Sequence, residues 1–289
     1  MQSFTKYILE NDGLLYNSGV KNVDEAKITV VVAAHKKYAM PDDSLYLPLE
    51  VGVDFHGKKT NYQGDNTGTN ISKKNDGFSE LTGLYWAFKN LKADYKGLVH
   101  YRRNFTIDKF RFGNPKRRLE KVLTEEQVKK ILAKNNVILP RKRNYIIENL
   151  YDHYVHTMHK EPLDLTGEII KEEYPKYYNE FLKLHERKTA HMFNMMIMRD
   201  DIFDDYCDWL FDILFELEKR VKKAGLKYDG FHARFYGRIS ELLLDVYIRT
   251  NKIDYVEVPV ISIEPVNWIK KGGSFLKAKF FGKKYKESF

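Results

Sequence analysis

Four consecutive residues, His100-Tyr101-Arg102-Arg103, carry the side chains with the clearest chemical potential in this sequence. They stand at the end of a short apolar run, residues 97–101, that is typical of a buried strand. Guanidinium groups bind phosphate through paired hydrogen bonds and keep their charge at any working pH. Two adjacent arginines at the carboxyl end of a strand therefore suit an anionic ligand. A solvated basic loop explains the charge equally well, and both interpretations stay open.

A polar loop at residues 64–75 (GDNTGTNISKKN) is a second candidate for ligand binding. Its small and amide-bearing residues let backbone N–H groups approach a phosphate or a sugar. A loop that only makes turns has the same composition and is the more common case.

Three histidines, His153, His156 and His159, are spaced three residues apart on a predicted helix. Such positions drift around the helix, so a polar helical face is favoured over a shared metal site. The single cysteine, Cys207, excludes a disulfide within the chain and a Cys-rich zinc site. The common signatures GxxxxGK[ST], GxGxxG, HExxH and GxSxG do not occur.

The elements that must position these groups alternate between strands and helices. Strands are predicted over residues 28–34, 45–53, 97–101, 137–139, 191–198 and 255–263. Helices are predicted over 79–91, 124–135, 149–187 (with Pro162 and Pro175 as breaks), 201–223 and 234–250. This alternation predicts an α/β fold with a mainly parallel sheet flanked by helices. Because ligands bind at the carboxyl ends of parallel strands, we expect the site in the loops after Ala34, Tyr101 and Met198.

The composition narrows the class of protein. The 289 residues are 43% hydrophobic and 14% aromatic, which excludes a disordered chain. The net charge of +9 is concentrated in residues 102–118 and 269–289, each with seven basic residues and one acidic residue. The rest of the chain is slightly acidic, unlike a uniformly basic nucleic-acid-binding protein. We find neither a signal peptide nor an apolar run long enough to span a membrane, so we expect a cytoplasmic protein.

Six sequence fragments, taken together, resemble one bacterial protein family. In order they are AAHKKY (33–38), GDNTGTNISKKN (64–75), ELTGLYWAFKN (80–90), GLVHYRRNF (97–105), HMFNMMIM (191–198) and GRISELLLDVY (237–247). They resemble the family known as domain of unknown function 4422, which is found in capsule, exopolysaccharide and O-antigen gene clusters. The resemblance extends from about residue 28 to residue 263, and it implies a GT-A-like domain over residues 27–268, after an N-terminal extension of residues 1–26.

The resemblance also implies an activity, the transfer of galactofuranose from UDP-galactofuranose to an undecaprenyl-diphosphate-linked glycan. The first strand and the AAHKKY segment would hold the uridine. Many GT-A relatives carry Asp-x-Asp at the position of His100–Arg103, where it holds a metal ion on the diphosphate. Because that motif is absent here, a metal requirement is left open, and the arginines are expected to stabilise the departing UDP instead. The expected donor-binding residues are His35, Asp65, Asn66, Asn70, Glu80, His100, Tyr101, Arg102 and Arg103.

Transfer with inversion at the sugar carbon needs a carboxylate to accept the proton of the acceptor hydroxyl. The candidates are Glu241 and Asp229. For Glu241 a carboxylate favoured by a helix dipole is the competing explanation, and for Glu80, a candidate ligand of donor hydroxyls, it is helix capping.

The tail at residues 269–289 interleaves lysines with aromatic residues, which suits an anionic membrane surface at the inner face of the cell membrane. A disordered basic tail is the alternative. Two further functions remain open. One is the same fold using another UDP-hexose, such as galactopyranose or glucose, and the other is a non-catalytic binder of nucleic acid or anionic glycan. We favour the enzyme without a nucleic-acid partner, because the resemblance lies mainly in the acidic body.

Overall fold

The computed structural model describes residues 22–264. The first strand, β1 (Ile28–Ala34), lies in the interior of the main sheet, between β4 and β2. Its sequence, ITVVVAA, is apolar on both sides. Val31 and Ala33 pack into one hydrophobic cluster, whereas Val30 and Val32 pack into another. Successive side chains point to opposite faces of a strand, so β1 is covered on both faces, as its unalternating sequence predicts.

The strands form one large sheet and one small one. In the nine-stranded sheet the order is β10-β6-β9-β4-β1-β2-β3, with β5 pairing to β4 and to β11. Only β9 on this path runs antiparallel to its neighbours, so the sheet is mainly parallel, as expected. The remaining strands are β2 (Tyr46–Glu50), β3 (Gln63–Gly64), β4 (Tyr95–His100), β5 (Arg103–Phe105), β6 (Val137–Pro140), β9 (Met196–Arg199), β10 (Val256–Val258) and β11 (Val260–Ser262), and the small sheet pairs β7 (Arg143–Asn144) with β8 (Thr189–Ala190).

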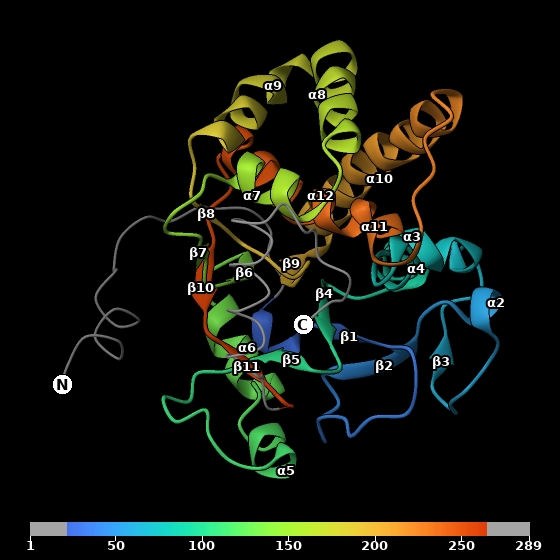
Figure 1. Cartoon of the computed structure of the whole chain (residues 1–289). Helices are drawn as coiled ribbons and strands as arrows, with labels where there is room; N and C mark the ends of the chain where they lie inside the picture. Colours follow the sequence, from blue (N-terminus) through green and yellow to red (C-terminus); the bar gives the residue numbers. More distant parts are fainter. Residues whose placement is uncertain (1–21, 265–289) are drawn as a thin grey trace.

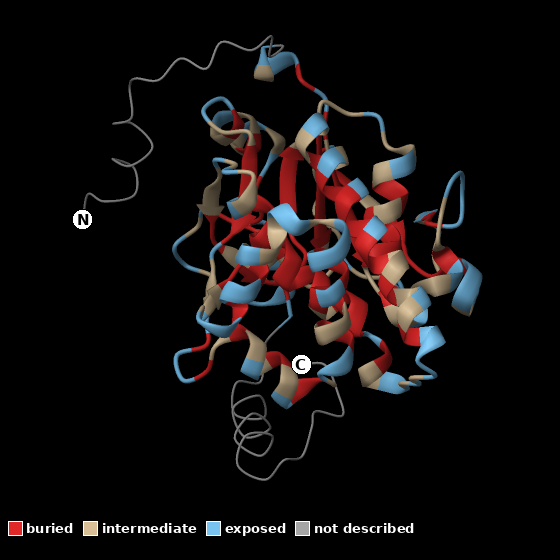
Figure 2. Cartoon of the chain, turned by 90° about the horizontal axis from the view of Figure 1, so that it is seen from above, coloured by how far each residue is buried: buried red, intermediate tan, exposed pale blue. Residues whose placement is uncertain are grey.

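Helices cover both faces of the sheet (Figure 1). Most of them pack on the face that holds the larger cluster, and the smaller cluster includes residues of α6. Figure 2 shows the buried residues concentrated in the interior. The α-helices are α2 (Val53–His56), α3 (Asn75–Phe78), α4 (Leu81–Asn90), α5 (Pro115–Leu119), α6 (Glu125–Leu132), α7 (Leu150–Thr157), α8 (Glu161–Glu173), α9 (Pro175–Leu182), α10 (Asp200–Lys223), α11 (Gly230–Ala233) and α12 (Phe235–Thr250), and the 3-10 helices are η1 (Val23–Glu25), η2 (Ser72–Lys74) and η3 (Lys183–His185).

Two sequence predictions need correction. The strand predicted over residues 191–198 begins only at Met196 and runs antiparallel to β4, so its carboxyl end lies at the edge opposite His100. The segment before β9, not the loop after Met198, therefore reaches the expected site. The strand predicted over residues 255–263 is divided into β10 and β11, which pair with different strands.

The expected basic tail at residues 269–289 lies outside the described residues, as do residues 1–21 of the expected N-terminal extension. Within residues 22–264, no helix combines the length and the apolar character needed to cross a membrane.

Candidate functional site

A pocket lies at the carboxyl end of β4, between the sheet and the helices α7, α11 and α12. Five arginines, two glutamates and two histidines line it together with apolar residues. The charged and imidazole groups are Arg102, Arg103, Arg143, Arg234, Arg238, Glu80, Glu241, His100 and His153. The sequence-predicted residues Glu80, His100, Arg102, Arg103 and Glu241 are thus brought together, although they come from distant parts of the chain.

The excess of cations gives this pocket an affinity for anions. Burial, together with the charge of the neighbouring Arg102, lowers the pKa of Arg103 to about 10. The guanidinium groups therefore repel one another in a partly desolvated place, and an anion that enters relieves this repulsion. The arrangement suits a phosphate or diphosphate group.

The two glutamates of the pocket differ in their protonation behaviour. Burial raises the pKa of Glu241, although its Oε2 accepts a hydrogen bond from Arg238 at 3.2 Å. Burial also acts to raise the pKa of Glu80, but the neighbouring His100 and the hydrogen bond from Asn194 outweigh it and hold this pKa below its usual value. Two carboxylates whose pKa values are pushed apart are the arrangement expected where one stays charged and the other exchanges a proton.

One tight turn, Phe193-Asn194, positions several of these groups. Its residues have φ angles of 81° and 50°, which non-glycine residues rarely adopt. The Phe193 N–H donates to Oε1 of Glu241 at 3.1 Å, and the Phe193 carbonyl accepts from Nε2 of His100 at 2.5 Å. The Asn194 amide donates to Oε1 of Glu80 at 2.8 Å. Strained backbone of this kind persists where the surroundings hold it, often at functional sites.

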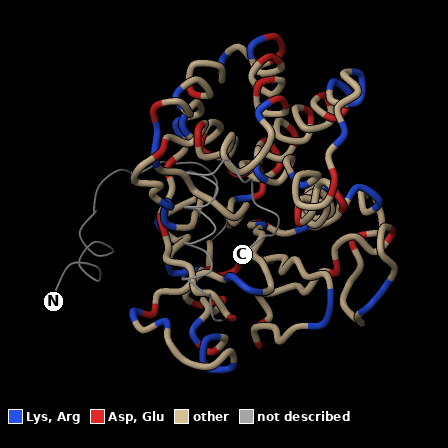
Figure 3. Tube along the Cα trace, viewed as in Figure 1, with Lys and Arg blue, Asp and Glu red and all other residues tan. Residues whose placement is uncertain are grey.

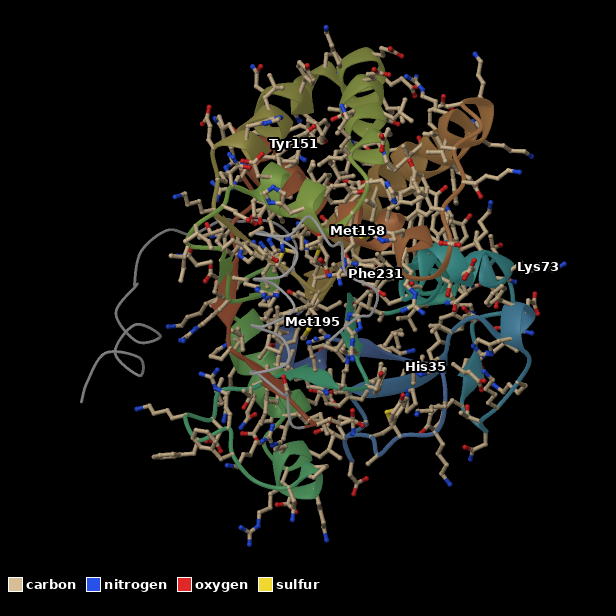
Figure 4. All side chains as sticks on the ribbon, viewed as in Figure 1. His35, Lys73, Tyr151, Met158, Met195 and Phe231 are labelled. Carbon is tan, nitrogen blue, oxygen red and sulfur yellow. The ribbon has the colours of Figure 1, made fainter. Side chains whose placement is uncertain are left out.

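An aromatic cluster stands beside the pocket, where β1 and β4 end. The rings of Tyr38 and Tyr101 are stacked with centroids 3.7 Å apart, and His35 meets both edge-on. The guanidinium of Arg102 lies 5.9 Å from the Tyr101 ring and joins the cluster to the pocket. Figure 4 labels His35 in this cluster and Phe231 of α11, which lines the pocket. His35 and Tyr101 thus lie next to the pocket without lining it.

Three of the expected donor-binding residues belong to the loop at residues 64–75, which the structure places outside the pocket lining. The fully buried Asp65 accepts hydrogen bonds from the N–H groups of Gly52 and Val53. It also accepts from the hydroxyls of Ser72 and Thr82. The carboxylate therefore holds the loop against α2 and α4 and is not exposed to a ligand.

The two asparagines of the same loop also bond within the protein. The amide of Asn66 donates to Asp54, whereas the amide of Asn70 donates to the Gly68 carbonyl. The expected contacts of these asparagines with a donor stay predictions.

Replacing Asp65 by alanine is expected to lower the free energy of unfolding by about 3 kcal/mol, because the charged acceptor of several buried hydrogen bonds is lost. Urea unfolding measures this change. The exposed Asp229→Ala serves as the control, with an expected change below about 0.5 kcal/mol. An Asp65→Ala protein as stable as the wild type would show that these bonds do not hold the loop.

The second candidate base, Asp229, is exposed at the start of α11 and does not line the pocket. Helix capping, the competing explanation for Glu80, is wrong, because this side chain makes no capping hydrogen bond and lines the pocket instead.

The three histidines of the predicted helix separate into two environments. Nδ1 of His153 and Nδ1 of His156 lie 3.2 Å and 3.1 Å from the Glu148 carboxylate, whereas His159 packs against the ring of Tyr228. In the described residues, no three His, Cys, Asp or Glu side chains are arranged to hold a metal ion. The favoured interpretation of a polar helical face is consistent with this arrangement.

The sequence alone does not identify the pocket residues Arg143, Arg234, Arg238 and Phe193. It also does not identify Asn194, which bonds to Glu80 of the pocket. One signal in the sequence points to Arg238. It precedes the candidate base Glu241 by three residues, a spacing that places both side chains on the same face of a helix. The turn had no such signal, because neither of its residues is glycine.

Two comparisons with known proteins give a match. The family model described as "Domain of unknown function (DUF4422)" matches residues 29–252. The apo structure of WbbM, described as a bifunctional glycosyltransferase, shares the fold with a TM-score of 0.73 and 27% sequence identity over 83% of this chain. This similarity confirms the expected GT-A-like fold. It covers 46% of the WbbM chain, so the present chain spans less than half of that protein's length. None of the curated proteins matches.

Proposed function

This chain belongs to the family described as domain of unknown function DUF4422, and from that premise we propose that it is a glycosyltransferase that uses a nucleotide-sugar donor. The observation that carries the proposal is the pocket at the end of β4, where cations gather around two glutamates of opposite pKa shift. The fold shared with WbbM, a bifunctional glycosyltransferase, supports it.

The donor in this proposal is UDP-galactofuranose. Arg102 and Arg103 bind its diphosphate, and the uracil ring lies against the aromatic cluster of His35, Tyr38 and Tyr101. This assignment rests on the position of Arg102. Its side chain lines the pocket and also lies 5.9 Å from the Tyr101 ring, so it links the pocket to the aromatic cluster. Glu80, held in its charged form, accepts hydrogen bonds from hydroxyls of the sugar.

The reaction proceeds with inversion, and Glu241 is its base. An acceptor oxygen forms a bond to the anomeric carbon while the bond from that carbon to the diphosphate oxygen breaks. The proton of the acceptor hydroxyl passes to the Glu241 carboxylate, and the charge that develops on UDP is stabilised by the arginines. A buried carboxylate with a raised pKa is a stronger base than an exposed one, which favours Glu241 over Asp229.

The acceptor in this proposal is an undecaprenyl-diphosphate-linked glycan of capsular polysaccharide, exopolysaccharide or O-antigen synthesis. Such an acceptor places the enzyme at the inner face of the cell membrane, where residues 269–289 contact anionic lipid. The positive charge of those residues supports this contact.

Binding of UDP tests the pocket apart from the chemistry. Calorimetric titration is expected to show UDP binding that weakens as salt is added, because the contacts are ionic. UMP, which lacks the second phosphate, is expected to bind at least about tenfold more weakly. Equal binding of UMP and UDP would contradict the role given to the arginines.

We propose that sugar transfer needs no divalent metal ion at the end of β4. Guanidinium groups cannot ligate a cation, and the position expected for Asp-x-Asp holds His100-Tyr101-Arg102-Arg103. We therefore expect sugar transfer to continue in EDTA at close to its rate without the chelator, measured as release of UDP. Loss of transfer in EDTA, restored by added Mn²⁺ or Mg²⁺, would show that a metal ion and not the arginines stabilises the leaving group.

A further inference from the structure

The segment between β5 and α5 presents large aromatic side chains to solvent. Phe110 and Phe112 are 72% and 77% exposed, and Ile107 is 43% exposed. None of the three packs against the two hydrophobic clusters of the core. Single exposed apolar residues are common, but three within six positions form a patch that is favourable to bury elsewhere.

Positive charge surrounds this patch. Residues 107–118 contain five basic residues and one acidic residue, and Lys109, Lys116 and Arg117 are exposed. The acidic residue, Asp108, is engaged within the segment, because its Oδ1 accepts the N–H of Phe110 at 2.7 Å. Figure 3 shows basic residues along this segment and on α5.

The segment is anchored at its far end. Nε of Arg118 donates to the Gly113 carbonyl at 2.7 Å, and its Nη1 donates to the Ser262 carbonyl of β11 at 2.8 Å. Gly113 has a φ of 126°, which favours glycine, and Asn114 caps α5 through the N–H of Arg117. The aromatic side chains therefore project from a base that is fixed to the sheet.

We propose that residues 107–118 form a docking surface for an anionic lipid membrane. Phe110 and Phe112 enter the boundary between headgroups and acyl chains, while Lys109, Lys116 and Arg117 contact lipid phosphates. Charge complementarity selects this occupant, since exposed cations around aromatic rings match a surface that is anionic outside and apolar within. The proposal depends neither on the proposed enzymatic activity nor on the tail at residues 269–289.

The docking surface is connected to the pocket through β5, whose first residue, Arg103, lines the pocket. One short strand thus links the two in the sequence.

Vesicle flotation of the full-length protein tests this surface. The wild type is expected to float with vesicles of phosphatidylglycerol and phosphatidylcholine and to stay unbound with phosphatidylcholine alone. The double variant Phe110→Ser/Phe112→Ser is expected to lose at least about tenfold in affinity for the anionic vesicles, and so is the variant Lys109→Glu/Lys116→Glu/Arg117→Glu. Thermal melting confirms that each variant is folded.

The control is Leu182→Ser, which removes a 43% exposed apolar side chain at the end of α9, at the opposite end of the molecule from α5 (Figure 1). It is expected to float like the wild type. In a second readout, Phe112→Trp adds fluorescence that brominated lipid quenches if residue 112 enters the bilayer.

Unchanged flotation of the double phenylalanine variant would overturn the proposal, as would a Trp at position 112 that brominated lipid does not quench. A third result would also overturn it, namely wild-type oligomers that the double variant dissociates while its vesicle binding is retained. The segment would then be a contact between copies of this chain.

Discussion

Glu241→Gln is expected to lower the turnover number for sugar transfer by about a thousandfold while UDP still binds with near wild-type affinity. The glutamine keeps the shape of the side chain and can still accept the Phe193 N–H, so the fold and the turn are retained. It cannot take a proton from the acceptor hydroxyl. Steady-state rates with a saturating donor, together with calorimetry of UDP, separate the two effects.

The matched control is Asp229→Asn, the same loss of charge at the other candidate base. Since Asp229 is exposed and does not line the pocket, we expect a turnover within about twofold of the wild type. If Asp229→Asn were the inactive variant and Glu241→Gln the active one, the assignment of the base would be reversed.

The same assignment sets the pH dependence of turnover. A base must be deprotonated to act, and burial raises the pKa of Glu241. Activity should therefore decline, as the pH falls, at a higher pH than the ordinary pKa of a glutamate would give.

Arg102→Ala is expected to weaken UDP binding by about a hundredfold and to lower the turnover number by a further tenfold or more. The guanidinium contacts the diphosphate in the bound donor and stabilises it more strongly as the sugar bond breaks. Arg102→Lys should recover part of the binding, because it keeps the charge but loses the paired hydrogen-bond geometry. Calorimetry and steady-state rates measure both variants.

A control for general loss of positive charge is Arg141→Ala, since Arg141 is exposed and does not line the pocket. Its donor binding should match that of the wild type at moderate salt, where distant charges are screened. Wild-type turnover of Arg102→Ala would contradict the role of this arginine in donor binding. It would favour the alternative that His100–Arg103 is a solvated basic loop.

The sequence predicts the core of the fold well, because buried parallel strands have a distinctive composition. The β-branched run of β1 and the prolines that separate α7, α8 and α9 are local signals, and both agree with the structure. The direction of β9 has no local signal. An apolar run pairs equally well in either direction, and its partners, β4 and β6, are distant in the chain.

The site is predictable only in part for a related reason. Residues at the end of a buried strand, such as Arg102 and Arg103, are found from their position. Arg234 and Arg238 lie next to or on a helix, where exposed arginines are common, so only the folded chain distinguishes them. Asp65 was expected to bind the donor because it is a polar residue in a polar loop. The structure places it in the interior, where it accepts hydrogen bonds from the protein.

The most direct test of the account is a transfer assay with UDP-galactofuranose, generated in place by a mutase, and a panel of lipid-linked acceptors. UDP-galactose and UDP-glucose serve as the alternative donors, and the product is detected by mass spectrometry. With the wild type, one galactofuranose is expected to be added to an acceptor, and Glu241→Gln is expected to abolish this product. Transfer from UDP-galactose or UDP-glucose but not from UDP-galactofuranose would contradict the donor assignment, and no transfer from any of the three would contradict the proposed function.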